Sequence, residues 1–287
     1  MSGILENGKV EKIENVSAKH AEETLSQKEL SQLEIAQSEI RYRNVKQLQV
    51  RHLNFAYPDG KQILKDISFK AEKGQIIGIT GPVACGKSTL GKVFLCEYPY
   101  EGQILVDGKE LQNMPQSWQT NIIGYLGHDP ELFNDSVENN VLMGEQKKTE
   151  DFLKMVCMAE EVNEMDDGLQ TLVGNGGVRL SGGQGKRLAL ARTLCHKKPV
   201  LVLDDPFSAL DKSTERQIFA NLKAQAKDYI VLLISHRLYL FPQMNQIIWM
   251  EDGKTVVGTH EELLVKVPEY KKLFTEEGGA ESEDRQK

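Results

Sequence analysis

The sequence has 287 residues, of which 40% are hydrophobic and 27% charged, and it carries a net charge of −7 at pH 7. A chain of this length can form one large domain or two small ones, and its acidic balance argues against nucleic-acid binding as the main activity. The four cysteines (Cys85, Cys96, Cys157 and Cys195) are widely spaced without a CxxC pair, which indicates reduced cytosolic thiols and excludes a disulfide framework or a zinc site.

Residues 1–46 are polar, rich in Glu, Lys, Gln and Ser, and nearly balanced in charge. They contain too few apolar residues to bury a core of their own, and they lack the basic-then-apolar pattern of a signal peptide. We expect a weakly amphipathic helix or a disordered extension. A solvated tail is favoured over a partner-binding helix.

The next segments predict strands. Residues 48–53 and 63–69 alternate between apolar and polar side chains, as half-buried strands do, and the turn Pro58-Asp59-Gly60 lies between them. The apolar run 76–79 predicts a buried strand, and residues 104–106 predict another that ends in a turn at Asp107-Gly108.

The most informative motif of the chain lies between the predicted strand 76–79 and a helix that starts at residue 89. Gly81–Ser88 matches the phosphate-binding pattern GxxxxGK[ST] at every fixed position. Its glycines let several backbone N–H groups converge on one point, where the following helix adds the positive end of its dipole. Lys87 would bind the β- and γ-phosphates and Ser88 would bind Mg²⁺. The expected nucleotide contacts are Gly81, Pro82, Val83, Ala84, Cys85, Gly86, Lys87, Ser88 and Thr89.

Cys85 of this loop precedes a helix N-terminus, which would lower the pKa of its thiol. Bound ATP should then shield the thiol from alkylation. A small space-filling side chain is the favoured alternative.

The second half of the chain alternates helices and strands. The pattern turns helical from about 135 to 165, and the apolar runs 200–203 and 230–234 are typical of a parallel sheet covered on both faces. These runs are too short for a membrane-spanning helix of ~18 residues, so any membrane role is expected to come through a partner. Helical stretches at 185–196 and 212–226, and strands at 247–250 and 254–257, complete an α/β pattern. We expect the charged tail 276–287 to be disordered.

Two features in this half point to phosphate chemistry. Asp204 ends an apolar strand, where a carboxylate can hold Mg²⁺ directly or through water, or can simply cap a helix. Ser181, Gly182, Gly183 and Gln184 stand at the start of the amphipathic helix 186–192, so they form either a second anion site or a plain N-cap.

In combination, these motifs resemble the ATP-binding cassette (ABC) ATPases over about residues 47–265. The phosphate loop, LSGGQ at 180–184, the acid strand 200–204 and His236 occur in the family's order and spacing. The resemblance implies an α/β fold: a P-loop NTPase (RecA-like) core with an N-terminal antiparallel β-subdomain and an α-helical subdomain inserted at about 130–185. A C-terminal helix end and charged tail would occupy 266–287. It also implies that the chain binds ATP and Mg²⁺.

The resemblance further implies a head-to-tail pair of cassettes, in which each ATP lies between one phosphate loop and the other chain's LSGGQ. Ser181 and Gly183, with their neighbours Gly182 and Gln184, would contact a nucleotide held mainly by the partner. His236 would contact the γ-phosphate, and residues 208–211 would cross the dimer interface. Tyr57 would stack on adenine, although a turn tyrosine is the alternative.

Two positions depart from the family pattern. Asp205 stands where the family has the catalytic Glu that polarises the attacking water, and it is one methylene shorter, by ~1.5 Å. Since a displacement of ~1 Å can cost ~10²-fold in rate, we expect slow hydrolysis at this chain's own site. His128 replaces the usual Gln that contacts Mg²⁺, and a protonated imidazole would oppose the metal. The intact LSGGQ then favours an asymmetric heterodimer.

Exporter-like segments occur at 132–139, 168–177 and 258–264, and residues 204–211 resemble the degenerate halves of multidrug-resistance-type exporters. We therefore expect an ATPase subunit or domain at the inner face of the cell membrane. Its expected partners are a transmembrane domain and a second cassette, with no nucleic acid. The alternatives are a soluble ABC ATPase of the translation or repair type and an ATP-sensing module that does not hydrolyse ATP.

Overall fold

The computed structural model describes residues 44–174 and 179–284, with side chains as far as residue 276. The predictions for the N-terminal extension up to residue 43, and for Asn175 to Val178 of one exporter-like segment, lie outside the described residues.

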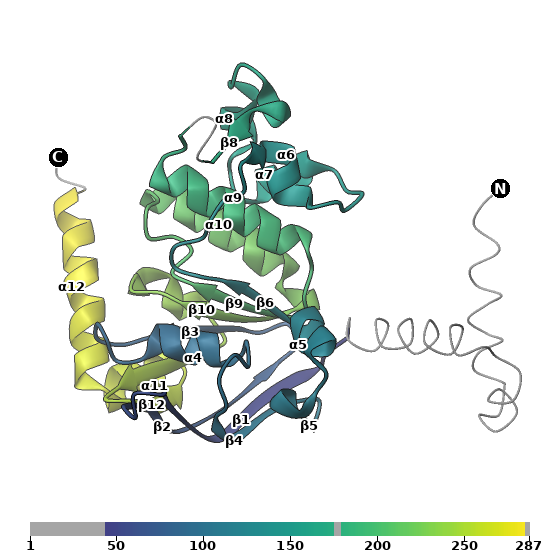
Figure 1. Cartoon of the computed structure of the whole chain (residues 1–287). Coiled ribbons are helices and arrows are strands. Elements are labelled where there is room, and N and C mark those ends of the chain that lie inside the picture. The colour runs from purple at the N-terminus through teal and green to yellow at the C-terminus, as the bar shows by residue number, and fades with distance from the viewer. Residues whose placement is uncertain (1–43, 175–178, 285–287) are drawn as a thin grey trace, which may run out of the picture. The chain divides into compact units, whose positions relative to one another are not determined.

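An antiparallel sheet forms the first part of the fold, as the alternating segments predicted (Figure 1). Its strands, in spatial order, are β2 (Gln62–Glu72), β1 (Gln47–Ala56), β4 (Glu101–Val106) and β5 (Lys109–Glu110). Alternate residues of β1, such as Leu48 and Val50, are buried. The register shifts beside His52, which has a positive φ of 47°, so the sheet is bulged there.

A six-stranded sheet forms the centre of the fold. Its order is β12 (Lys254–Gly258), β11 (Gln246–Glu251), β3 (Ile76–Thr80), β10 (Ile230–Ile234), β9 (Val200–Asp204) and β6 (Ile123–Leu126). All neighbours pair in parallel except β11 and β12. Every residue of β3, β9 and β10 is buried, as expected for a sheet covered on both faces.

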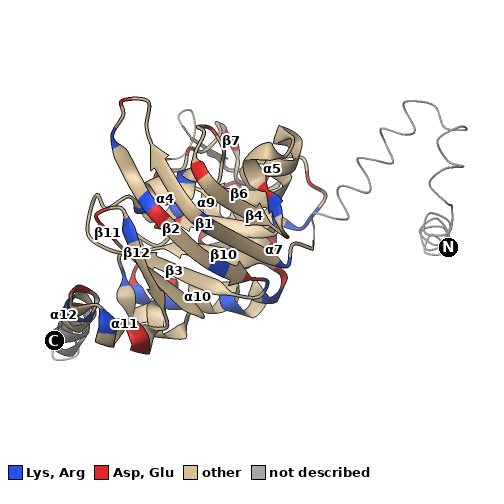
Figure 2. Cartoon of the chain, turned by 90° about the horizontal axis from the view of Figure 1, so that it is seen from below, with Lys and Arg blue, Asp and Glu red and all other residues tan. Residues whose placement is uncertain are grey.

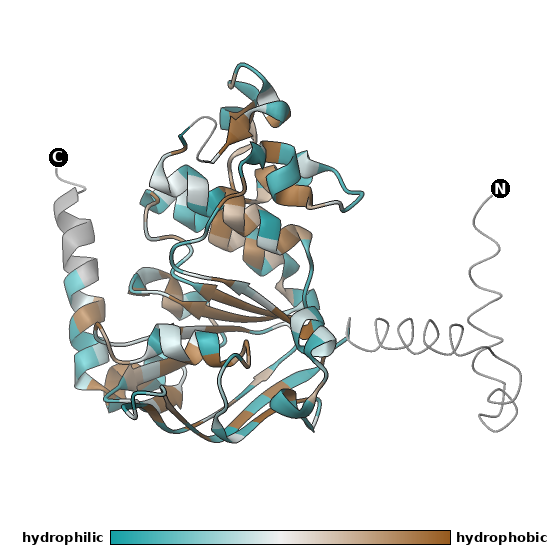
Figure 3. Cartoon of the chain, viewed as in Figure 1, coloured by the Kyte–Doolittle hydropathy of each residue, from teal (hydrophilic) through white to brown (hydrophobic). Residues whose placement is uncertain are grey.

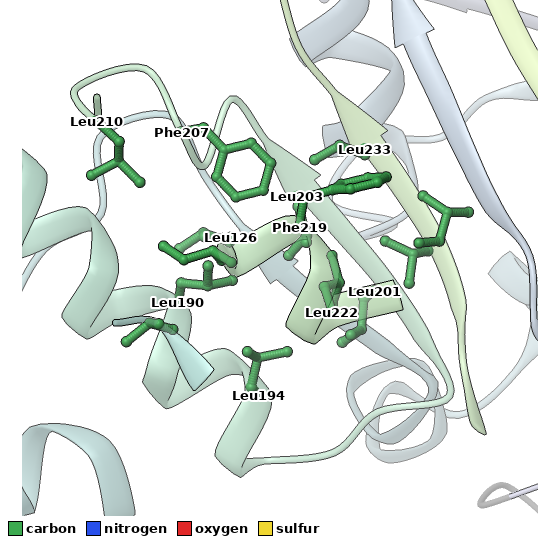
Figure 4. Close-up of a cluster of buried hydrophobic side chains, with 14 of the residues drawn as sticks. Leu126, Leu190, Leu194, Leu201, Leu203, Phe207, Leu210, Phe219, Leu222 and Leu233 are labelled. Carbon is green, nitrogen blue, oxygen red and sulfur yellow. The ribbon is translucent and has the colours of Figure 1, made fainter. Parts of the chain in front are cut away.

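The two faces of this sheet belong to two hydrophobic clusters. Val200 and Val202 pack with α4 (Lys87–Val93) and the antiparallel sheet, whereas Leu201 and Leu203 pack with α9 (Gly182–Cys195) and α10 (Lys212–Gln225). Figure 4 shows this second cluster. The alternation of side chains along each strand therefore divides one apolar run between two layers of helices, and the brown central strands in Figure 3 mark that interior.

The predicted helical subdomain packs on α9, above the sheet in Figure 1. It contains α6 (Val137–Leu142), α7 (Thr149–Met155), α8 (Ala159–Asn163) and the short pair β7 (Asp135–Ser136) and β8 (Leu172–Val173). Short 3-10 turns lie at Leu111–Asn113, Gly168–Gln170, Ala226–Asp228 and Leu238–Gln243.

Two parts of the fold differ from the sequence expectation. We did not predict α5 (Gln116–Ile122) or β6, because four residues that include Gly124 carry little strand signal. The C-terminal helices are α11 (His260–Lys266) and α12 (Pro268–Asp284), so the helix extends through most of the segment expected to be disordered. Fully buried Tyr270, edge-on to Trp249 at 6.0 Å, anchors the first turn of α12, and the helix continues from that fixed start.

Acidic and basic side chains are interspersed on the face seen in Figure 2. Among the helices of the described residues, none has the length and apolar character needed to cross a membrane.

Candidate functional site

The phosphate loop connects β3 to α4 with a curled backbone. Gly81, Ala84 and Gly86 have positive φ angles of 149°, 64° and 104°. A Cβ atom on Gly81 would lie 2.0 Å from the carbonyl oxygen of Met250, so only glycine fits there. The close approach of β11 thus fixes the start of the loop.

Lys87 is folded back onto this loop. Its side chain is only 6% exposed, and its Nζ donates hydrogen bonds to the carbonyl oxygens of Gly81 at 2.9 Å and Pro82 at 2.7 Å. Burial lowers the pKa of Lys87. Phosphate oxygens would offer this ammonium a stronger, charge-assisted partner than two neutral carbonyls.

A cavity of about 350 Å³ opens beside Lys87. Its lining joins the phosphate loop to the ends of β9 and β10 and to the segment after β6, because the carboxyl ends of parallel strands meet at one edge of the sheet. Ile63 also lines it, although sequence reasoning had not selected this residue. The predicted residues that it brings together are Val83, Ala84, Gly86, Lys87, Ser88, Thr89, His128, Asp204, Asp205 and His236.

The residues in this cavity fit a magnesium ion. Asp204 is 2% exposed, and its Oδ2 has no hydrogen-bond partner within the described residues. A buried carboxylate oxygen without a partner is costly unless a cation or water completes it. Ser88 lines the same cavity. Oxygen ligands from one or two side chains, completed by phosphate and water, are what Mg²⁺ prefers.

The two departures from the family pattern meet in this cavity. Asp205 Oδ2 lies 3.6 Å from His128 Nδ1, and their side chains are 11% and 51% exposed. Asp205 has a positive φ of 52°, a conformation that Asp tolerates better than longer side chains do. Asp205 therefore suits the backbone conformation at this position, and its carboxylate lies close to the imidazole of His128.

His236 faces the same space as a neutral imidazole. Burial, followed by the positive charge of Lys87, lowers its pKa, while Asp205 and Asp204 act in the opposite direction. A neutral imidazole can donate one hydrogen bond to a phosphate oxygen without adding charge. This fits the γ-phosphate contact expected for His236.

The residues predicted to form a second anion site lie at the start of α9. Ser181 Oγ accepts a hydrogen bond from the Gln184 N–H at 3.2 Å, and Gln184 Oε1 accepts one from the Ser181 N–H at 2.9 Å. This reciprocal capping box confirms the predicted helix start. A Cβ on Gly183 would lie 2.8 Å from the carbonyl oxygen of Ala209, so Gly183 lets the loop 208–211 pack against the helix.

Ser181 and Gly182 line a separate cavity of about 630 Å³, together with the basic residues Arg179 and Lys186. This cavity shares no lining residue with the one beside Lys87, as far as the described residues go. The residues of the two predicted anion sites therefore line different cavities.

Tyr57 lies in an aromatic cluster and not in the lining of the 350 Å³ cavity. Its ring is edge-on to Phe55 at 5.0 Å and to Tyr98 at 5.9 Å. Tyr98 is 44% exposed and was missed by sequence reasoning. Only its place in the folded chain identifies it as a neighbour of Tyr57.

Cys85 is a buried side chain, as the favoured space-filling interpretation has it, and the lowered pKa suggested by the helix terminus is wrong. The side chain is 9% exposed, and burial raises the pKa of the thiol more than neighbouring Lys87 lowers it. Desolvation opposes the thiolate, and here it outweighs the helix terminus and the ammonium, whose Nζ is 3.7 Å from Cys85 Sγ.

Cys85 should consequently react slowly with N-ethylmaleimide at pH 7.5, more slowly than an unstructured cysteine peptide, and faster as the pH rises toward its raised pKa. Mg-ATP should slow the reaction further by covering the loop. Peptide mapping by mass spectrometry separates Cys85 from the other cysteines. Rapid labelling at neutral pH, unaffected by Mg-ATP, would contradict both the burial and the nucleotide site.

Comparisons with known proteins agree with this site. The family model described as ABC transporter matches residues 64–208. The chain is 35% identical over 242 residues to ATP-binding cassette sub-family B member 6 of Xenopus tropicalis, covering 82% of this chain and 28% of that protein. It is 36% identical over 235 residues to the ATP-dependent lipid A-core flippase of Salmonella typhimurium, covering 79% and 40%.

A probable multidrug resistance ABC transporter ATP-binding/permease protein of Bacillus subtilis, YheI, is 37% identical over 243 residues, covering 80% of this chain and 42% of that protein. Among solved structures, a bacterial Atm1-family ABC exporter with ATP bound matches with a TM-score of 0.77 and 29% identity, covering 82% and 42%. The chain thus spans less than half the length of each of these relatives.

Proposed function

Because the chain belongs to the ABC transporter family, we propose that it is the ATP-binding and hydrolysing subunit or domain of an exporter. In this proposal it works with a transmembrane partner at the inner face of the cell membrane. ATP closes a pair of cassettes, and hydrolysis reopens them.

The observation that carries the proposal is the separation of the two anion sites. Lys87 and His236 line one cavity and Ser181 lines another with no described lining residue in common, which supports an arrangement in which one triphosphate contacts the two sites of different chains. A second cassette that offers its own helix start to the ATP at Lys87 would complete each site. The relative solved with ATP bound has the same fold over 82% of this chain.

Exposed apolar side chains on the helical subdomain support contact with a membrane partner. Phe133 and Leu172 are 52% and 56% exposed, and a Cβ on Gly174 would lie 3.0 Å from the Phe133 carbonyl oxygen, so the two segments adjoin. The Arg192 guanidinium lies over the Phe133 ring at 4.8 Å and holds it in place. We assign these two exposed side chains to the surface that meets the transmembrane partner, because they belong to adjoining segments of the helical subdomain.

Asp205 and His128 favour an asymmetric pair. The short acid at this chain's own phosphate loop supports slow hydrolysis there, while the well-formed cap at Ser181 suits a competent site on a partner that carries Glu. A non-hydrolysing ATP-sensing module remains the second candidate, and the same two residues favour it.

Three measurements test the proposal. A tagged chain should co-purify from detergent extracts with a polytopic membrane protein. Mg-ATP should bind with a Kd in the usual range for enzyme substrates, between ~1 μM and ~1 mM. Phosphate release should be slow for the isolated chain and faster for the complex, and Lys87→Ala should prevent ATP binding to the isolated chain. If wild-type chain and complex both bind ATP without releasing phosphate, the sensing module is the correct function.

A further inference from the structure

A single carboxylate of the helical subdomain holds the start of α9. Glu161, on α8, accepts hydrogen bonds at Oε2 from Gln184 Nε2 at 3.0 Å and from Arg187 Nη2 at 2.9 Å. Its Oε1 accepts another from Arg187 Nη1 at 2.5 Å. Gln184 and Arg187 lie one turn apart on α9, so Glu161 spans the first turns of that helix.

The side-chain amide of Gln184 links Glu161 to Ser181. Its Nε2 donates to Glu161 and its Oε1 accepts from the Ser181 backbone N–H at 2.9 Å. An ionised carboxylate can only accept, so Glu161 requires the N–H end of the amide to face it. The oxygen end must then face Ser181, which fixes the orientation that the capping box needs.

Arg187 makes the position of Glu161 rigid. Arg187 is 8% exposed, and its guanidinium pairs with both carboxylate oxygens and also donates to the Cys157 carbonyl oxygen at 2.6 Å. Bidentate charge-assisted pairs of this kind are among the stronger polar contacts. The hydrogen bond from Arg187 lowers the pKa of Glu161, so the carboxylate stays ionised at neutral pH.

We propose that Glu161 is a positioning residue for the anion site at Ser181. Through the Gln184 amide it holds Ser181 where a triphosphate bound by the second cassette must be received. This inference rests on the proposed function, since only a paired cassette brings a nucleotide to Ser181. A displacement of ~1 Å at such a site can lower the rate by ~10²-fold. A shift of α8 would reach Ser181 through the same bonds.

Glu161→Gln tests the link with little change of shape. It replaces one carboxylate oxygen by an NH₂ group, so Arg187 faces a donor in either orientation of the new amide, and Gln184 also does so where the NH₂ group takes the place of Oε2. Glu160→Gln is the matched control, because Glu160 is the exposed neighbour on the same helix and loses the same charge.

The first measurement is amide hydrogen exchange on the full chain. Glu161→Gln should speed exchange at the amides of residues 181–185 by ~5–10-fold, through local opening of the cap, while residues 189–193 in the middle of α9 stay unchanged. Glu160→Gln should match the wild type at both places. Faster exchange throughout α9 would mean a general structural role and would overturn the proposal.

The second measurement is ATP turnover with the second cassette present. Glu161→Gln should lower kcat by at least ~10-fold, with the Kd for ATP at this chain's own phosphate loop within twofold of wild type. If wild-type chain and companion do not associate with ATP, the proposed function fails. If they associate and Glu161→Gln turns over like Glu160→Gln, the proposed function stands and the role of Glu161 is wrong.

Discussion

Asp205→Glu is expected to raise ATP hydrolysis at this chain's own phosphate loop by up to ~10²-fold, because it brings the carboxylate ~1.5 Å closer to the attacking water. The structure adds a condition. Asp205 has a φ of 52° and its Oδ2 lies 3.6 Å from His128 Nδ1, so the longer acid must share its space with an imidazole. The double variant His128→Gln with Asp205→Glu should therefore hydrolyse ATP faster than Asp205→Glu alone.

The measurement is single-turnover phosphate release from the complex, with the companion cassette disabled at its own phosphate-loop lysine. Four proteins form a double-mutant cycle: wild type, His128→Gln, Asp205→Glu and the double variant. Residues that are in contact are expected to show non-additive effects. Brisk hydrolysis by the isolated wild-type chain, with no gain from Asp205→Glu, would contradict both the slow-site prediction and the asymmetric pair.

Sequence reasoning predicted the elements whose signal is local. Continuous apolar residues predicted the buried strands β9 and β10, and the strands predicted at 247–250 and 254–257 are β11 and β12. Asp204 was predicted as a possible Mg²⁺ ligand because it ends the apolar run of β9, and ligands bind at the carboxyl ends of parallel strands. In each case the residues that carry the signal are neighbours in the chain.

The features that sequence reasoning missed depend on contacts between distant segments. A Cβ on Gly124 of β6 would lie 2.9 Å from Leu201 Cδ2, so the position of β6 depends on its close packing against β9. The raised pKa of Cys85 depends on how deeply the loop is buried, which the helix-terminus argument did not contain. Likewise, nothing around Glu161 in the sequence indicates that its carboxylate meets Gln184 and Arg187.

The same distinction applies to the candidate site. The motif predicted which residues gather around Lys87, and the cavity includes most of them. It did not predict that Lys87 would be bonded to the Gly81 and Pro82 carbonyl oxygens, nor that His128 would meet Asp205. The residue types in the motif were enough to predict phosphate binding. The contacts of Lys87 and His128 could be found only from the folded structure.

Ser181→Arg should lower turnover by the complex at least ~10²-fold, a loss comparable to that caused by removing one anion-stabilising donor from an active site. Ser181 is exposed and lines its cavity together with the basic residues Arg179 and Lys186 and the acidic residues Asp129 and Glu131. The new side chain would occupy the place of the incoming phosphate and remove the cap hydroxyl.

ATP binding at this chain's own phosphate loop should not change in Ser181→Arg, because the cavity beside Lys87 shares no described lining residue with the one at Ser181. Ser181→Asn is the matched control for the cap, since Asn caps helices about as well as Ser. It should keep the helix start, with the carboxamide oxygen of Asn as the cap in place of the Ser181 hydroxyl. Equal loss of own-site ATP binding and of turnover in Ser181→Arg would mean that both anion sites act on one nucleotide within one chain, which would refute the two-cassette arrangement.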